Sequence, residues 1–292
     1  MQPRSFIHII LAFILIVTFS SFSYSQAKFT SKVISGNWNS KLSWTILGVD
    51  EDSIPDANDS VIISSTSTNR IIVIPIGVSA FCGHLVVGTE GQGTGGGITM
   101  EDSSSLQCLS LTVNRPSNGT RLVSINNGTV FVSGDVVLNS SSNATTRISR
   151  INLTNGTLFV KGNINYNANI ASNAIVDLSN GTSSVILEGE FKLNPVGSFN
   201  SGTTGTIVFK GSNHQIIPSK QSSFLYNNIV IDKHSQSEVE IDSSITLNNV
   251  KGNIHVLSGS LDMGEYYIIG SASKTFELDN TTRLLIGKSN SI

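Results

Sequence analysis

One eight-residue pattern recurs along the middle of this chain and ends each time in glycine. The copies are 127–134 (NGTVFVSG), 155–162 (NGTLFVKG), 182–189 (TSSVILEG) and 204–211 (TGTIVFKG). Their last glycines are 28, 27 and 22 residues apart. A repeat of this length indicates stacked units, none of which can bury its apolar face alone. The chain is therefore expected to wind through a series of similar coils.

Each copy combines a turn with one β-strand. Side chains alternate between the two faces of a strand, and an Asn-Gly or Thr-Gly pair before it supplies the turn, because Gly and Asn tolerate positive φ. The inward positions would then be Val130 and Val132, Leu158 and Val160, Val185 and Leu187, and Ile207 and Phe209. We predict an all-β fold, a right-handed parallel β-helix or solenoid with about 22–28 residues per coil. A stacked β-sandwich is the alternative.

The other positions of the same strands would face outward. The middle position is apolar in every copy: Phe131, Phe159, Ile186 and Val208. A loop or a second sheet is expected to cover it, unless it is a docking surface. The position before the last glycine places Lys161, Glu188 and Lys210 in neighbouring coils. These three are a candidate ligand face for an anionic glycan; the alternative is a solvated row of charges, each pair contributing less than about 1 kcal/mol.

The two cysteines repeat the same spacing. Cys82 and Cys108 both begin a C-x-x-L-x-V pattern, 26 residues apart. This spacing predicts the same phase in adjacent coils, where the Cα atoms would be within disulfide range. We expect either a disulfide or two parallel thiols.

Composition and motif searches argue against several functions. Only 13% of the residues are charged and the formal net charge is −2, so clustered cations for a nucleic acid are missing. His84, His214, His234 and His255 show no metal-ligand spacing. The glycine-rich segment 88–97 (GTEGQGTGGG) has no Gly-Lys-Ser/Thr after it, which favours an insertion between coils over a phosphate loop. We therefore expect no cofactor, no metal and no catalytic residue.

The N-terminus indicates export. Arg4 precedes an apolar run over 6–19 and a small polar stretch, which is the layout of a secretory signal peptide over 1–25. No later segment is apolar enough to span a bilayer, which takes roughly 20 residues. We expect a secreted or outer-surface protein with an N-terminal cap and first coils over 33–110 and β-solenoid repeats over 111–292.

Two groups of motifs carry a family resemblance. The first is 35–44 (SGNWNSKLSW), 54–59 (IPDAND) and 61–63 (VII); the second is 205–211 (GTIVFKG), 214–217 (HQII) and 224–231 (FLYNNIVI). Together they resemble secreted surface proteins of Bacteroidota, and the first group is also similar to the eight-glycine domain. The resemblance implies a large, adhesin-like β-helical protein exported by type IX secretion through a C-terminal sorting domain. On that basis we expect the repeats to be incomplete at the C-terminus.

Two tryptophans lie in the first of these motif groups. Trp38 and Trp44 could stack on a sugar, or they could close the core of the first coil as a cap.

Two functions are compatible with these observations. The favoured one is a non-enzymatic, structural or adhesin-like solenoid that presents an extended face to an extracellular glycan or a surface protein, with end-to-end self-association as a further expectation. The alternative is a polysaccharide-binding or polysaccharide-degrading β-helix, a lyase or hydrolase. Degradation would need carboxylates, or a carboxylate with Lys or Arg, converging from adjacent coils.

Overall fold

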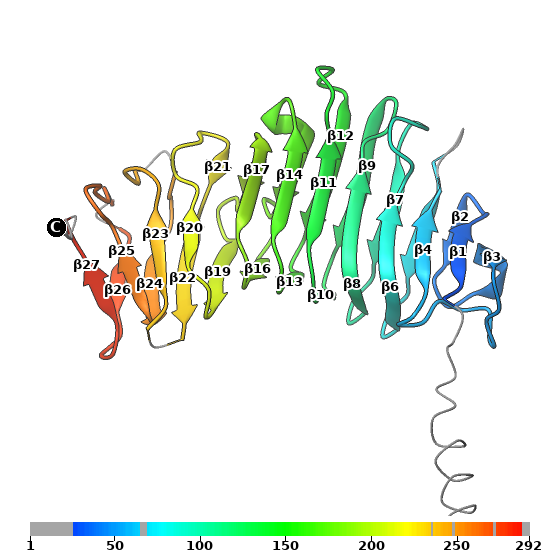
Figure 1. Cartoon of the computed structure of the whole chain (residues 1–292), viewed down its shortest axis with the longest axis horizontal. Helices are drawn as coiled ribbons and strands as arrows, with labels where there is room; N and C mark the ends of the chain where they lie inside the picture. Colours follow the sequence, from blue (N-terminus) through cyan, green and yellow to red (C-terminus); the bar gives the residue numbers. More distant parts are fainter. Residues whose placement is uncertain (1–25, 65–68, 235, 247–248, 271–272, 288–292) are drawn as a thin grey trace, which may run out of the picture.

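The computed structural model describes residues 26–64, 69–234, 236–246, 249–270 and 273–287. The expected signal peptide over 1–25 lies outside these residues. The described chain is a parallel β-solenoid of about 9 turns, which confirms the predicted fold class and excludes the β-sandwich (Figure 1). Its helices are two short 3₁₀ turns, η1 (Lys41–Ser43) and η2 (Ala171–Asn173). None of the described helices has the length and apolarity to cross a membrane.

Most coils contribute a strand to each of three walls. The largest sheet has 15 strands and begins with β1 (Lys28–Ser31), β3 (Trp44–Leu47), β4 (Ser60–Ile63), β6 (Ser79–Val87) and β8 (Ser105–Asn114). It divides at β8, because the two halves of this strand pair with different strands of the next coil. The first half continues into the strands that we call the first wall: β10 (Thr129–Val132), β13 (Thr157–Val160), β16 (Ser184–Leu187), β19 (Thr206–Gly211), β22 (Asn228–Lys233), β24 (Ile254–Ser258) and β26 (Phe276–Leu278). The second half continues into the second wall, which is formed by β11 (Val136–Ser140), β14 (Ile164–Ala168) and β17 (Phe191–Pro195).

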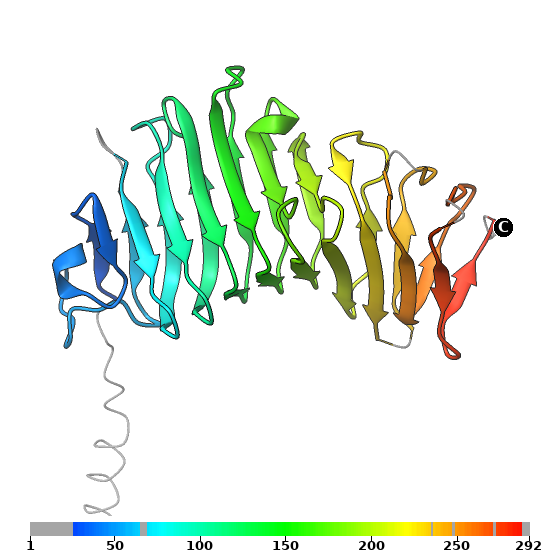
Figure 2. The same ribbon diagram turned by 180° about the vertical axis from the view of Figure 1, so that it is seen from behind.

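Two smaller sheets complete the cross-section. The 8-stranded sheet contains β2 (Ser35–Asn37), β5 (Ile71–Ile74), β7 (Gly96–Met100), β9 (Gly119–Ile125), β12 (Arg147–Leu153), β15 (Ala174–Asp177), β18 (Ser198–Asn200) and β21 (Phe224–Leu225). The 4-stranded sheet contains β20 (Gln215–Ile217), β23 (Glu238–Ile241), β25 (Ser260–Asp262) and β27 (Arg283–Leu285). Seen from the front and from behind, the solenoid is bowed, and β10, β13 and β16 lie along the inside of the bow (Figures 1 and 2).

The predicted inward columns form the core. Val130, Leu158, Val185 and Ile207 pair in register in successive coils, and so do Val132, Val160, Leu187 and Phe209. All eight side chains are buried. The alternation read from the sequence is therefore confirmed.

The glycine that ends each of the first three repeats lets neighbouring coils approach closely. A Cβ at Gly189 would lie 2.2 Å from the carbonyl oxygen of Gly162, and a Cβ at Gly162 would lie 2.5 Å from that of Gly134. No side chain fits at such distances. The chain bends here between the first and second walls, and the next residue joins the coils: the Asp135 carboxylate accepts the N–H of Asn163 at 2.7 Å.

The first coil is closed by a cap. β3 runs antiparallel to β1, the one antiparallel pair among the described strands. Trp38 and Trp44 are buried with ring centroids 5.4 Å apart, and the indole N–H of Trp44 donates to the carbonyl of Trp38 at 2.8 Å. These rings cannot stack on a sugar, because their faces are covered by the core. The cap interpretation is confirmed, and Trp38 and Trp44 do not belong to the candidate ligand face.

Candidate functional site

The strands of the first wall turn two rows of side chains to the outside. The first row is in register from coil to coil and carries a hydroxyl at every step. We call it the hydroxyl column: Ser79, Ser105, Thr129, Thr157, Ser184 and Thr206. Each of these residues is half-buried or exposed, whereas the residue that follows it in the strand is buried. The strand alternation therefore fixes their outward direction.

Hydrogen bonds link parts of the hydroxyl column along the solenoid axis. Ser105 Oγ donates to Ser79 Oγ at 3.1 Å, and Thr157 Oγ1 and Ser184 Oγ are also 3.1 Å apart. A hydroxyl has one donor and two acceptor positions. Such a bond leaves acceptor positions on both oxygens, so the column can still bind a ligand.

The second row lies two residues further along each strand and is mainly apolar. We call it the apolar column: Phe81, Gln107, Phe131, Phe159, Ile186, Val208 and Val230. Phe81 is 41% exposed and none of the others is buried. Phe131 and Phe159 meet edge to face, with centroids 5.0 Å apart. Neighbours in the column shield one another, and because none of these side chains is buried, the cover by a loop or a second sheet expected from the sequence is not borne out.

The predicted charged residues lie at the border of these columns. Lys161 and Glu188 directly follow β13 and β16, and Lys210 occupies the equivalent position near the end of β19, so the three lie in successive coils as expected. However, the Lys161 ammonium lies over the Phe131 ring, 5.5 Å from its centroid, and Lys210 Nζ pairs with Asp232 at 2.8 Å. The three residues are therefore neighbours but do not form one ladder of ion pairs in the described structure.

A small depression adjoins this border. It has a volume of about 260 Å³ and is lined by Glu188, Lys210, Asp232, Lys233, His234 and Ser258. Ser258 Oγ donates to Asp232 at 3.0 Å, and the hydrogen bond from Lys210 holds the pKa of the Asp232 carboxyl below its ordinary value. The sequence pattern missed Asp232, Lys233 and His234, because they lie at and directly after the end of β22, a strand outside the four aligned copies. Their signal was the polar run directly after the apolar residues 229–231.

Lys233 is the buried member of this depression. Its ammonium donates to the carbonyls of Lys210 at 3.0 Å and Asn213 at 2.5 Å, and to Gln215 Oε1 at 2.6 Å. Burial lowers its pKa to about 8. An ammonium has three hydrogens, and all three are used here. Lys233 thus joins the turn after β19 to β22 and has no hydrogen left for a ligand.

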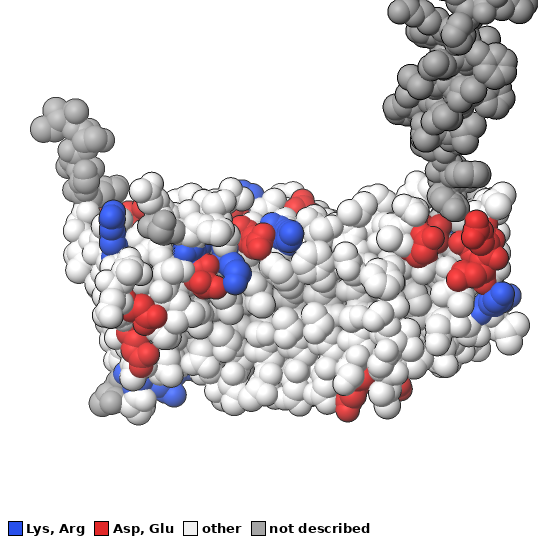
Figure 3. Space-filling view, turned by 90° about the horizontal axis from the view of Figure 1, so that it is seen from below, with Lys and Arg blue, Asp and Glu red and all other residues white. Residues whose placement is uncertain are grey.

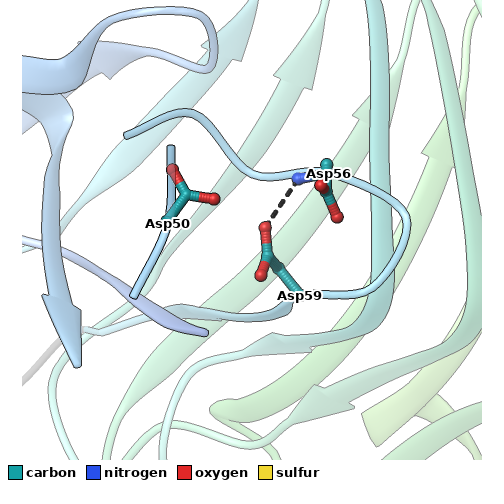
Figure 4. A group of neighbouring side chains, drawn as sticks. All are labelled: Asp50, Asp56 and Asp59. Atoms are coloured by element: carbon teal, nitrogen blue, oxygen red, sulfur yellow. Dashed lines mark hydrogen bonds between the residues drawn. The ribbon is translucent and has the colours of Figure 1, made fainter. Parts of the chain in front are cut away.

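A cluster of three carboxylates lies near the N-terminal cap (Figure 4). Oxygens of Asp50, Asp56 and Asp59 lie within 4.8 Å of one another. Both oxygens of Asp59 accept backbone N–H groups, from Ala27 at 3.1 Å and from Asp56 at 2.8 Å, and burial raises the pKa of this carboxyl. Oxygens of this kind could hold a hard cation such as Ca²⁺. The bonds seen here shape the loop over 50–59.

The cysteines have the predicted phase. Cys82 pairs in register with Cys108 on the adjacent coil, and both are buried free thiols. A hydrogen bond to Cys108 and burial raise the pKa of the Cys82 thiol. The register is therefore confirmed, and of the two expected states the structure has the pair of thiols.

The last described coils leave apolar surface open. A cavity of about 290 Å³ is lined mainly by apolar side chains, among them Ile254, Met263, Phe276 and Leu284. Within the described chain, β26 and β27 are the end strands of their sheets.

On one face of the molecule, charged side chains gather mainly toward the two ends (Figure 3). Seen from below, Lys and Arg lie beside Asp and Glu in the C-terminal half and near the N-terminal cap, with a largely uncharged surface between them (Figure 3). No protein-family model, curated protein sequence or solved structure matches this chain.

Proposed function

We propose that this protein is a secreted or cell-surface, non-enzymatic, adhesin-like solenoid, and that its binding face is formed by the hydroxyl and apolar columns. One observation carries the proposal. A hydroxyl and a mainly apolar side chain recur in register at the surface of six successive coils, from β6 to β19. The fold alone requires only the inward residues of these strands to be regular, because outward residues need merely be compatible with solvent.

The shape of the solenoid supports the same conclusion. Stacked repeats create long surfaces whose curvature suits extended ligands. Here β10, β13 and β16 lie on the inside of the bow, where a ligand can touch several coils at once (Figure 1). Many weak contacts along such a face would add up to useful affinity without a deep pocket.

The depression around Glu188 favours a second candidate function, degradation of a polysaccharide. Carboxylates and a lysine do converge there from adjacent coils, as acid-base chemistry requires. However, Lys210 and Asp232 neutralise each other and the hydrogens of Lys233 are all engaged. A catalytic base would have to be Glu188, so this function makes a specific prediction about that residue.

The test is a binding and turnover experiment with the chain from residue 26 onward. The purified protein is incubated with bacterial and host cell surfaces and with insoluble polysaccharides, and bound protein and released reducing ends or unsaturated uronates are measured. We expect binding without release. Release that disappears in Glu188→Gln would establish the enzyme instead, and a protein that binds no surface would overturn the adhesin proposal.

A further inference from the structure

We infer that the ligand of the hydroxyl and apolar columns is an extended, uncharged polysaccharide that lies along the solenoid axis, with about one sugar ring per coil. This inference rests on the proposed binding function and names the ligand class. It is carried by three features of the face: its spacing, its chemistry and its lack of charge.

The spacing of the columns matches a sugar chain. Parallel strands in register repeat at about 4.8 Å, and a ring in an extended β-linked polysaccharide advances by nearly the same distance. Each successive ring would therefore meet an equivalent pair of side chains. An extended peptide advances by about 3.3 Å per residue, so its side chains would lose phase with the coils after two or three residues.

The chemistry of each step also fits a sugar ring. A hexose has hydroxyls around its rim and an apolar C–H surface. Along the coils from β10 to β19, Thr129, Thr157, Ser184 and Thr206 provide one hydroxyl each, and each has an aromatic or aliphatic neighbour two residues further on. The hydroxyl column would bond the rim of the ring while the apolar column covers its C–H surface.

The columns carry no charge where they are most regular. From Ser79 to Val230 neither column contains an ionisable side chain. The apolar column becomes ionisable only at its C-terminal end, where Val230 pairs in register with His255 of the next coil and His255 with Glu277 of the coil after that. The His255 ring lies 2.9 Å from the carboxylate of Asp279. No residue of the two columns from Ser79 to Val230 is a cation that could pair with an anionic polymer. The two lysines at the border of the columns already have partners, because Lys210 forms an ion pair with Asp232 and the Lys161 ammonium lies over the Phe131 ring.

The experiment is a calorimetric titration of the chain from residue 26 onward with three series of neutral β-1,4-linked oligosaccharides, made of glucose, mannose or xylose, from the disaccharide to the octasaccharide. We expect at least one series to bind about threefold more tightly with each added ring, the effect of one modest hydrogen bond per step. The gain should level off near the hexasaccharide, which would span the hydroxyl column. Oligogalacturonides of equal length serve as the anionic series.

A pair of matched variants locates the ligand. Thr157→Val removes a hydroxyl from the middle of the column and keeps the shape of the side chain, and we expect it to weaken hexasaccharide binding by about threefold, the contribution of one step. Thr112→Val makes the same change on an outward position of the second half of β8, away from the columns, and should leave affinity unchanged. Melting curves of both variants check that the fold is intact.

Several outcomes would overturn the inference. These are affinity that does not grow beyond the disaccharide, equal loss in both variants, preference for oligogalacturonides, or failure of all three neutral series. If surface binding persists in any of these cases, the adhesin proposal stands and only the ligand class is wrong. Loss of all surface binding would instead remove the proposed function itself.

Discussion

Single buried cations hold two irregular parts of this solenoid in place. Arg121 points into the interior at the start of β9 and donates to carbonyls of the glycine-rich insertion over 88–97, including Thr89 at 2.8 Å, and to Asn114 at 3.2 Å. Burial lowers its pKa to about 10, so it remains charged at neutral pH. Gly88 is required beside it, because a Cβ there would lie 1.8 Å from the guanidinium. The insertion is thus folded around one side chain.

Replacing Arg121 should be costly. Arg121→Met would leave several carbonyls of the insertion, most of them part-buried, without their donor, and we expect the free energy of unfolding to fall by about 3–5 kcal/mol. Arg283→Met, an exposed change in β27, should stay within about 0.5 kcal/mol. Urea unfolding followed by circular dichroism measures both. Similar values for the two variants would show that Arg121 does not organise the insertion.

Lys233 should make stability depend on pH. Its pKa is about 8 in the folded protein against an ordinary 10.5, so between these values the unfolded chain binds the additional proton. The free energy of unfolding therefore rises as the pH increases from 8 to 10.5, by at most about 3 kcal/mol from this group. Lys233→Met should flatten this rise, whereas Lys161→Met, at an exposed position, should retain it. Denaturant unfolding at pH 7.5 and 10 measures the difference, and equal slopes in Lys233→Met and the parent protein would contradict the assignment.

At the scale of elements, the strand alternation separates tolerant from intolerant positions. Val160 is buried in β13 between in-register neighbours, while Lys161 beside it is exposed. Val160→Asp should cost several kcal/mol, because it buries an unpaired carboxylate between coils. Lys161→Ser should cost less than about 1 kcal/mol. Thermal melting of the two variants tests the alternation, which would be refuted by equal shifts.

The paired strands β6 and β8 predict the chemistry of the cysteines. Because Cys82 and Cys108 are buried neighbours and the pKa of Cys82 is raised, neither thiol should react with a disulfide reagent in the folded protein. Two thiols should react after unfolding without reductant. If none reacts even then, the two residues form the disulfide that their register allows.

The first wall could be predicted from the sequence, and the other walls could not. The strands β10, β13, β16 and β19 repeat their pattern of turn, alternation and glycine, so the repeat alone aligns Val130, Leu158 and Val185. Strands β9, β12 and β15 share only a short alternation of an apolar, a polar and an apolar residue, which ends at Ile125, Leu153 and Leu178. So short a pattern does not identify a separate wall, and coils of unequal length hide the phase of the other strands. The partners of Arg121 and Lys233 are likewise invisible in the sequence, because each contact joins segments whose distance depends on how the coils stack.

At the scale of the whole molecule, the two ends of the described solenoid differ. The N-terminal end is closed by the antiparallel strand β3 and the buried Trp38 and Trp44. At the other end Phe276 and Leu278 of β26 are 40% and 44% exposed, and the strand borders the apolar cavity of about 290 Å³. An end strand presents unpaired N–H and C=O groups, which another strand can bind. β3 is also an end strand, but the core beside it is closed by the two tryptophans, whereas β26 combines its free edge with an open apolar cavity. Self-association is therefore expected at β26 and not at the capped end.

The chain from residue 26 to 292 should accordingly show concentration-dependent association in light scattering. Leu278→Lys places a charge on the exposed end strand, where lysine opposes edge-to-edge pairing, and should shift the protein toward monomer. Leu47→Lys is the matched control, because Leu47 is also an exposed leucine on an end strand, β3, but at the capped end. It should leave association unchanged. A parent protein that stays monomeric at every concentration, or association lost equally in both variants, would mean that β26 is not the surface through which copies meet.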